Sequence, residues 1–198
     1  MKRIFVIGGM GAGKSMASEA LAEQGLPTID LDEIGHEVLE RECVKADLAD
    51  AFGEDVLDEK GEVDRVALAA KAFSSAGKTD LLNSITMPRI EEAVAERIES
   101  IKQDTEAVVV EFSAFKNREA SLIAEGDCVI AVLAPLEARI ERAVAAGWDE
   151  DDVRRRIARQ ITDAERRKAA DVVFCNDSSP DKFRRRVADW WGDFKDNI

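Results

Sequence analysis

The sequence contains little of what metal clusters, disulfide scaffolds and membrane spans require. Its one histidine, His36, excludes a site built from several histidines. The three cysteines, Cys43, Cys128 and Cys175, are odd in number and follow no C-x-x-C spacing. Cys128 and Cys175 fall in apolar runs, so we expect them to be buried thiols rather than disulfides or metal ligands. No apolar run approaches the roughly 18 residues of a membrane span, and the apolar run near the start is too short for a signal peptide. We therefore expect a cytoplasmic protein.

Positive charge is also scarce. The chain has 28 Lys and Arg against 41 Asp and Glu, a net charge of -13, which disfavours broad binding to nucleic acid or to a membrane surface. A small anionic ligand is still compatible, because a phosphate site needs only a local group of donors. At 198 residues with 45% hydrophobic residues, the chain predicts one folded domain, with or without an inserted subdomain; its oligomeric state is unknown.

The stretch from Gly8 to Ser15, Gly-Gly-Met-Gly-Ala-Gly-Lys-Ser, matches the phosphate-loop pattern G-x-x-x-x-G-K-[ST]. The apolar run 4–7 precedes it and a helical pattern over 16–23 follows it, which is the strand–loop–helix context of this motif. Glycines let the backbone approach a polyphosphate, and N–H groups at a helix start attract it. Lys14 supplies a cation for the β- and γ-phosphates, and the Ser15 hydroxyl suits Mg²⁺. The motif predicts binding of a nucleoside triphosphate; the alternative is an ordinary glycine-rich turn.

Five short apolar segments predict strands, at roughly 3–7, 27–30, 107–112, 127–133 and 171–175. The third and fourth are apolar nearly throughout rather than alternating, which is typical of strands covered on both faces. Helical patterns separate the strands. We therefore predict an α/β chain with the three-layer P-loop NTPase fold, a five-stranded parallel sheet, a helical insert and a lid.

Residues 33–104 show successive helical patterns without a strong strand signal, which is more chain than a crossover connection needs. Asp64 is a candidate N-cap there, and Pro88 precedes a helical stripe that includes Val94 and Ile98. We predict three parts: a nucleotide-binding core (1–32, 105–135 and 170–198), a helical acceptor-binding insert (33–104) and a lid arm (136–169).

The lid arm is predicted to form two helices, one from Pro135 to Ala146 and one over 150–169. The second is predicted to bury one face, formed by Val153, Ile157, Ile161 and Ala164. Its other face carries Arg154, Arg155, Arg156, Arg159, Arg166 and Arg167. Acidic residues four positions before several of these arginines indicate an ion-paired, solvated face. The alternative is that one or two of the arginines face the phosphates.

A terminal helix is predicted to begin at Pro180 and to dock on the core through an aromatic stripe.

The sequence resembles the dephospho-coenzyme A kinases, which phosphorylate the ribose 3′-hydroxyl of dephospho-CoA with ATP. The resemblance covers nearly the whole chain. Its motifs are Ile7–Ser15, Ile29-Asp30-Leu31-Asp32 with Ile34 and His36, Phe52-Gly53, Gly61–Arg65, Asn83 with Pro88, Arg156-Ile157 with Gln160, and Ala170-Asp171 leading to Asn176.

The resemblance implies roles for individual residues. Asp32 corresponds to the candidate base on the acceptor hydroxyl, a task that suits a carboxylate at that strand end. The alternative for Asp32 is a structural strand-end acid, and Asp30 is the more structural of the two acids. Arg142 corresponds to a lid arginine that stabilises the migrating phosphoryl group. Arg65 and the Met87 position correspond to the acceptor side, with an exposed helix-start arginine as the alternative for Arg65. The implied ATP contacts are Gly9, Met10, Gly11, Ala12, Gly13, Lys14, Ser15, Met16 and Asn176, with Ser15 on Mg²⁺; the alternative for Asn176 is a turn residue.

The chain departs from the family's pattern mainly on the acceptor and lid sides. Met87 stands where the family usually has histidine, Ala146 replaces the second lid arginine, and Met16 replaces the usual threonine. The segment Glu111–Phe115 replaces the usual Pro-Leu-Leu-x-Glu. Glu111 either assists Mg²⁺ through water or is a strand-end acid without that role. The resemblance thus implies a dephospho-CoA kinase; the alternatives are a kinase of another hydroxyl acceptor and a non-catalytic ATP-binding relative.

Overall fold

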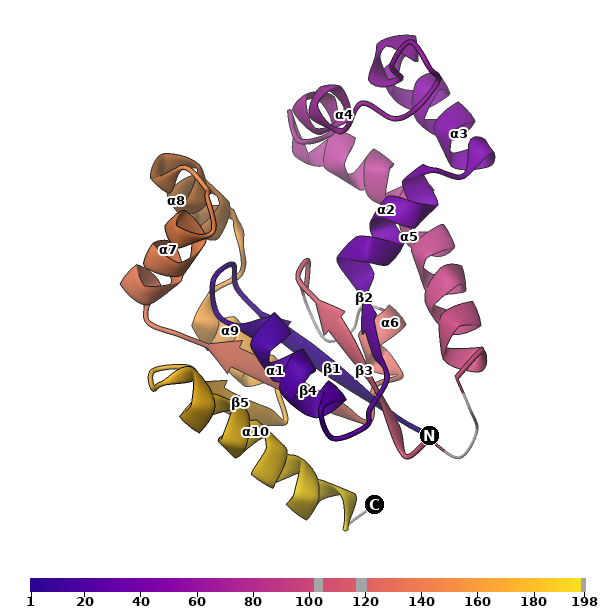
Figure 1. Cartoon of the computed structure of the whole chain (residues 1–198). Coiled ribbons are helices and arrows are strands. Elements are labelled where there is room, and N and C mark those ends of the chain that lie inside the picture. The colour runs from indigo at the N-terminus through magenta and orange to yellow at the C-terminus, as the bar shows by residue number, and fades with distance from the viewer. Residues whose placement is uncertain (102–104, 117–120, 197–198) are drawn as a thin grey trace. The chain divides into compact units, whose positions relative to one another are not determined.

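The computed structural model describes residues 1–101, 105–116 and 121–196 (Figure 1). The chain divides into two compact units, a sheet unit (Met1–Asp30 with Ile101–Ile198) and a helical unit (Leu31–Ser100). The predicted insert boundary at residue 104 lies outside the described residues, and the separation of a lid arm from the core stays a prediction. In the described part of the chain, no helix is long and apolar enough to cross a membrane.

The sheet unit contains one parallel sheet whose five strands lie in the order β2-β3-β1-β4-β5. The strands are β1 (Lys2–Gly8), β2 (Thr28–Asp30), β3 (Ala107–Phe112), β4 (Cys128–Leu133) and β5 (Val172–Cys175). Every residue of β3 and β4 is buried, which explains why these segments are apolar without alternation. The predicted α/β fold and its five strands are confirmed.

Helices cover the sheet. The helices α1 (Lys14–Ala22) and α10 (Pro180–Lys195) pack on the face formed by Ile4, Val6 and Ile130, through the buried Leu21, Phe183 and other apolar residues. On the other face lies Phe5, whose ring approaches Gly126 just after α6 (Ser121–Ala124). The remaining helices of this unit are α7 (Leu136–Ala145), α8 (Glu150–Arg159) and α9 (Asp163–Ala169).

The predicted terminal helix is present as α10, with Pro180 in its first turn. Its aromatic stripe docks against the core: Trp191 is buried, and the rings of Trp190 and Phe194 stack with centroids 4.8 Å apart. Of the cysteines, Cys128 is buried as expected, whereas Cys175 is half-buried and Cys43 is exposed.

The strand register brings three chain segments to the carboxyl edge of the sheet. Asp30, the last residue of β2, is the Cα partner of Glu111 in β3. Glu111 is in turn the partner of Val6 in β1, two residues before β1 ends at Gly8. Ligands of open α/β sheets bind at this edge. The register places Glu111 beside the strand that leads into the glycine-rich loop, and Asp30 one strand further away.

The prediction of one helix over 150–169 was wrong. Helix α8 ends at Arg159 and α9 begins at Asp163. Thr162 forms a capping box with Glu165, so the local sequence specifies a new helix start inside an apparently continuous pattern. The break also changes which residues face inward, because Ala164 is exposed and Arg166 is buried.

The helical unit consists of α2 (Leu31–Leu39), α3 (Glu42–Phe52), the 3₁₀ turn η1 (Glu54–Val56), α4 (Arg65–Ala72) and α5 (Ala76–Glu99). Asp64 caps α4 as predicted: its carboxylate accepts hydrogen bonds from the N–H groups of Val66 and Ala67, at 2.9 and 3.1 Å. A core of aliphatic side chains that includes Val38, Leu48 and Val94 holds the helices together.

Helix α5 continues through Pro88 instead of beginning near it. Proline lacks the N–H that an interior helical residue donates. The next residue, Arg89, stabilises this region, since its guanidinium donates to the carbonyl of Ile85 at 3.0 Å. The same side chain forms an ion pair with Asp47 at 2.8 Å and so joins α5 to α3.

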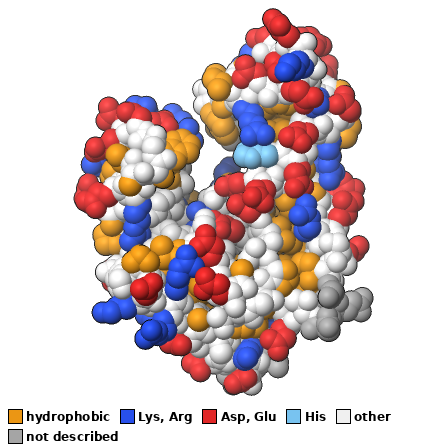
Figure 2. Space-filling view, in the orientation of Figure 1, with side chains coloured by type: hydrophobic (Ala, Val, Ile, Leu, Met, Phe, Trp, Pro, Cys, Tyr) orange, Lys and Arg blue, Asp and Glu red, His pale blue; other side chains and the backbone are white. Residues whose placement is uncertain are grey.

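The excess of acidic residues is visible on the surface. On the face shown in Figure 2, Asp and Glu side chains lie on both units, and Lys and Arg are interspersed among them. Several of these residues form ion pairs on helix surfaces, such as Arg156 with Asp152 at 2.7 Å and Arg97 with Glu37 at 3.1 Å. Exposed pairs of this kind contribute little to stability, about 0–1 kcal/mol each.

Candidate phosphate-binding site

The loop between β1 and α1 has the backbone that a phosphate loop requires. Gly11 and Gly13 have φ angles of 72° and 101°, in the left-handed region that favours glycine. Gly13 is also the N-cap of α1, and among the described residues no side chain caps this helix. Within the loop, the N–H of Met10 donates to Gln160 and that of Ala12 donates to the Gly9 carbonyl. An anion at this loop would therefore be attracted mainly by the start of α1.

Lys14 and Ser15 meet Glu111 at the sheet edge. The Ser15 hydroxyl donates a hydrogen bond to Oε1 of Glu111 at 3.0 Å, and the Lys14 ammonium lies 4.0 Å from the same oxygen. The Lys14 and Glu111 side chains are each only 10% exposed. The structure thus joins the loop to β3 through the acid whose role the sequence left open.

Burial raises the pKa of Glu111, and the neighbouring Asp30 adds to this effect. The charge of Lys14 and the hydrogen bond from Ser15 oppose it, because both favour the carboxylate. A further cation would stabilise the ionised form of this buried carboxylate, because it offsets the loss of hydration that burial imposes.

The donor set at this point suits a magnesium ion. The Ser15 hydroxyl and the Glu111 carboxylate are hard oxygen donors, which Mg²⁺ prefers, and Mg²⁺ usually keeps several waters and phosphate oxygens as its other ligands. Within the described residues, no group of three or more His, Cys, Asp or Glu side chains forms a metal cluster. The site therefore fits an ion shared with a bound triphosphate rather than one held by the protein alone.

Side chains from distant parts of the chain hold the carbonyl groups of the loop. Asn176, which follows β5 and is 1% exposed, donates its amide to the carbonyl of Ala12 at 2.9 Å. Arg142 of α7 donates to the Asn176 carbonyl at 3.0 Å and, more weakly, to that of Gly11 at 3.4 Å. The structure places Arg142 and Asn176 at the loop, where their contacts are with backbone carbonyls. Their roles on the phosphoryl group and on adenine stay predictions.

Two further loop contacts were missed at the level of sequence. Arg139 of α7 donates to the carbonyl of Met10 at 2.9 Å, and Gln160 accepts from the N–H of Met10 at 3.0 Å. Gln160 was noticed only as part of a family pattern. Arg139 stands in a helix rich in charged residues and has no signal that distinguishes it from an exposed arginine.

The other predicted site residues lie in the helical unit. Asp32 is in the first turn of α2, Arg65 is the first residue of α4, and Met87 is a half-buried residue of α5 just before Pro88. Their roles in base catalysis and acceptor binding stay predictions.

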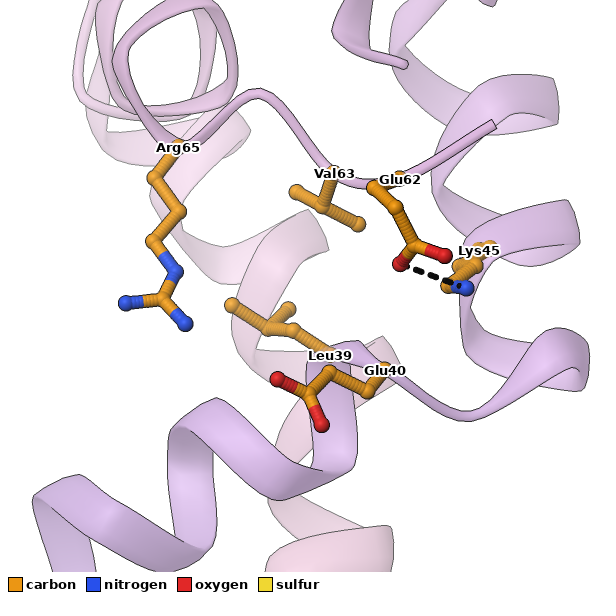
Figure 3. Close-up of a pocket in the computed structure, with 6 residues that line it drawn as sticks. All are labelled: Leu39, Glu40, Lys45, Glu62, Val63 and Arg65. Carbon is orange, nitrogen blue, oxygen red and sulfur yellow. Dashed lines mark ion pairs between the residues drawn. The ribbon is translucent and has the colours of Figure 1, made fainter. Parts of the chain in front are cut away.

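Arg65 lines a cavity of about 450 Å³ within this unit (Figure 3). The cavity is also lined by Leu39, Glu40, Lys45, Glu62 and Val63. Lys45 forms an ion pair with Glu62 at 2.7 Å, whereas the side chains of Arg65 and Glu40 point toward the open space. The cavity thus presents a guanidinium and a carboxylate beside aliphatic groups.

The parallel sheet and the glycine-rich loop with Lys14 and Ser15 define a nucleotide-binding protein of the P-loop phosphotransferase class. The family model described as dephospho-CoA kinase matches residues 3–182. The chain therefore belongs to the dephospho-CoA kinase family, and the resemblance inferred from its motifs is confirmed.

A curated relative agrees with this assignment, and two solved structures share the fold. The dephospho-CoA kinase of Corynebacterium efficiens is 42% identical over 190 residues, which cover 94% of each chain. A crystal structure of TT1252 from Thermus thermophilus has a TM-score of 0.82 at 26% identity and covers 97% of each chain. A dephospho-CoA kinase structure from Campylobacter jejuni has a TM-score of 0.73 at 23% identity, over 100% of this chain and 99% of that one, and it supports the fold.

Proposed function

We propose that this protein transfers the γ-phosphoryl group of ATP to the 3′-hydroxyl of dephospho-CoA. The observation that carries the proposal is the contact of Ser15 and Lys14 with the buried Glu111, in a chain of this family. This contact gathers a cation, a hydroxyl and a carboxylate at the end of a loop that is shaped for phosphates. A further proposal is that the enzyme works in the cytoplasm.

The chain's own groups account for ATP binding. N–H groups of residues 9–16 surround the phosphates, apart from those of Met10 and Ala12, which donate to Gln160 and to the Gly9 carbonyl. The Lys14 ammonium neutralises charge that develops on the β- and γ-phosphates. Ser15 and Glu111 would hold the magnesium ion that accompanies ATP; when bound, this ion neutralises phosphate charge. Arg142 is proposed to act on the migrating group after exchanging its carbonyl partners for phosphate oxygens, which bind a guanidinium more strongly.

The helical unit is proposed to bind the acceptor. Asp32 accepts the proton of the attacking 3′-hydroxyl, whose oxygen then forms the new bond to phosphorus while ADP leaves. The cavity at Arg65 suits an acceptor that carries both phosphate and amide groups, because it offers a cation, a carboxylate acceptor and aliphatic walls. Met87 is proposed to line the acceptor side without the hydrogen bond that a histidine would offer.

The test is incubation of the protein with ATP, Mg²⁺ and dephospho-CoA, followed by mass spectrometry for one added phosphate. We expect CoA as the product. The Asp32→Asn variant should bind ATP normally and turn over at least a hundredfold more slowly, in the range of general-base effects.

A coupled ADP-release assay with a panel of nucleotides and small hydroxyl metabolites distinguishes the alternatives. Product with another acceptor only would indicate a kinase of different specificity, for which the Met87 departure is the motivating feature. ATP binding without transfer to any acceptor would indicate a non-catalytic relative.

A further inference from the structure

The break between α8 and α9 places Gln160 at a corner of the chain, beside the phosphate loop. Gln160 is the residue after α8, and Thr162 caps the next helix, which begins at Asp163. The side-chain oxygen of Gln160 accepts a hydrogen bond from the N–H of Met10 at 3.0 Å, across 150 residues of sequence. Gln160 therefore belongs both to the turn between α8 and α9 and to the contact with the phosphate loop.

Arg139 binds the other backbone polar group of Met10, its carbonyl. Its Nε donates to the Met10 carbonyl at 2.9 Å, and its Nη2 donates to the Gln160 side-chain oxygen at 3.3 Å. Arg139 is 4% exposed, and a Cβ at Gly9 would lie 2.0 Å from its Nη2. The glycine at position 9 thus makes room for the guanidinium, and both the N–H and the C=O of Met10 are bound.

The cluster around Gln160 carries an excess of positive charge. Arg166 is buried beside Arg139, and the two guanidinium groups share one carboxylate, that of Asp163, at 2.8 and 3.5 Å respectively. The two guanidinium groups outnumber the single carboxylate, so the cluster has a net positive charge. Gln160 accepts from both guanidinium groups without adding negative charge, so it supplies hydrogen bonds and leaves the cluster cationic.

We propose that Gln160 and Arg139 are positioning residues for ATP, which fix the two peptide groups on either side of Met10 in the phosphate loop and keep a net positive charge beside them. The inference rests on the proposed function only in taking ATP as the ligand of the loop. Each of the two peptide groups that flank Met10 has one polar group bound, so the backbone at Met10 has one orientation before ATP arrives. Binding therefore requires less ordering of the loop than it would with an unrestrained peptide.

The decisive variant is Gln160→Met, which has a similar length and no hydrogen-bonding amide. Gln160 is half-buried, so the change should leave the fold intact. We expect the Kd for ATP, measured by calorimetry without acceptor, to rise about tenfold, the effect of losing hydrogen bonds to charged groups. The KM for ATP should rise in parallel, while the KM for the acceptor stays close to wild type and the thermal midpoint falls by only a few degrees.

Two companion variants separate positioning from a general structural role. Gln160→Glu still accepts from Met10 and from both arginines but cancels the excess charge, so its Kd should lie between those of the wild type and Gln160→Met. Gln24→Met is the matched control: Gln24 is exposed and its side chain forms no hydrogen bond with the described residues, so its Kd should equal the wild-type value.

An unchanged ATP affinity in Gln160→Met would overturn the inference. So would equal losses in ATP and acceptor affinity together with a thermal midpoint lowered by more than a few degrees, because that pattern indicates general destabilisation. Since ATP binding is measured without an acceptor, failure of the wild type to phosphorylate dephospho-CoA would count against the proposed function alone.

Discussion

Replacement of Gly13 by alanine tests the loop geometry most directly. The residue combines a left-handed φ of 101° with a side-chain neighbour, since an added Cβ would lie 2.3 Å from Nδ2 of Asn176. An L-residue in left-handed geometry costs roughly 1–2 kcal/mol. Displacing the buried Asn176 amide from the Ala12 carbonyl removes its hydrogen bond, at a further cost of about 1–3 kcal/mol. We therefore expect Gly13→Ala to lower the free energy of unfolding by about 2–5 kcal/mol.

Gly25 provides a matched control, because its φ is 89° and an added Cβ would meet nothing within 4 Å. Gly25→Ala should therefore cost only the backbone component, roughly 1–2 kcal/mol. In an Asn176→Ala background the clash disappears, and Gly13→Ala should then cost about as much as Gly25→Ala.

The assay is urea unfolding followed by tryptophan fluorescence. All three tryptophans, Trp148, Trp190 and Trp191, belong to the sheet unit, so the signal reports on the unit that contains the loop. If Gly13→Ala costs the same with and without the Asn176 side chain, the contact between the two residues has no energetic role and the reasoning fails.

Three further predictions concern the site and the helical unit. Because burial raises the pKa of Glu111 above its ordinary 4.5, ionisation of this acid destabilises the fold progressively as pH rises from that value toward the raised pKa. Urea titrations across this pH window should therefore show Glu111→Gln gaining stability relative to wild type. Stability curves that run parallel with pH in the two proteins would contradict this. In turnover assays, Glu111→Gln should require a higher Mg²⁺ concentration. Lys14→Ala should lower kcat by orders of magnitude with an unchanged circular dichroism spectrum, and full activity would remove Lys14 from the mechanism. Asp64→Ala removes the cap of α4 and should destabilise it by about 1 kcal/mol, seen as faster hydrogen exchange in residues 65–72, whereas unchanged exchange would show that the cap contributes nothing.

Several features of this protein follow from short stretches of its sequence. The phosphate loop is readable because its chemistry needs glycine, lysine and a hydroxyl at adjacent positions, between a strand and a helix. The strands are readable because burial on both faces excludes polar residues, as in Val108-Val109-Val110. The N-cap at Asp64 depends on residues only two and three positions away.

Other features depend on contacts that no local pattern encodes. Arg139 and Arg166 look like members of a solvated charged face, but the path of the chain buries both around Gln160. Gln160 reaches Met10 only because the helix pattern is interrupted at Thr162.

By itself, the sequence determined the strand–loop–helix motif, the parallel α/β fold and the family, because each depends on residue types at fixed spacing along the chain. Only the tertiary structure decided which side chains hold the loop: Glu111 on Ser15, Asn176 on Ala12, and Arg139 with Gln160 on Met10. The physical reason is that these bonds join residues from about 100 to 160 positions apart. Their geometry exists only after the strands have paired and the helices have packed.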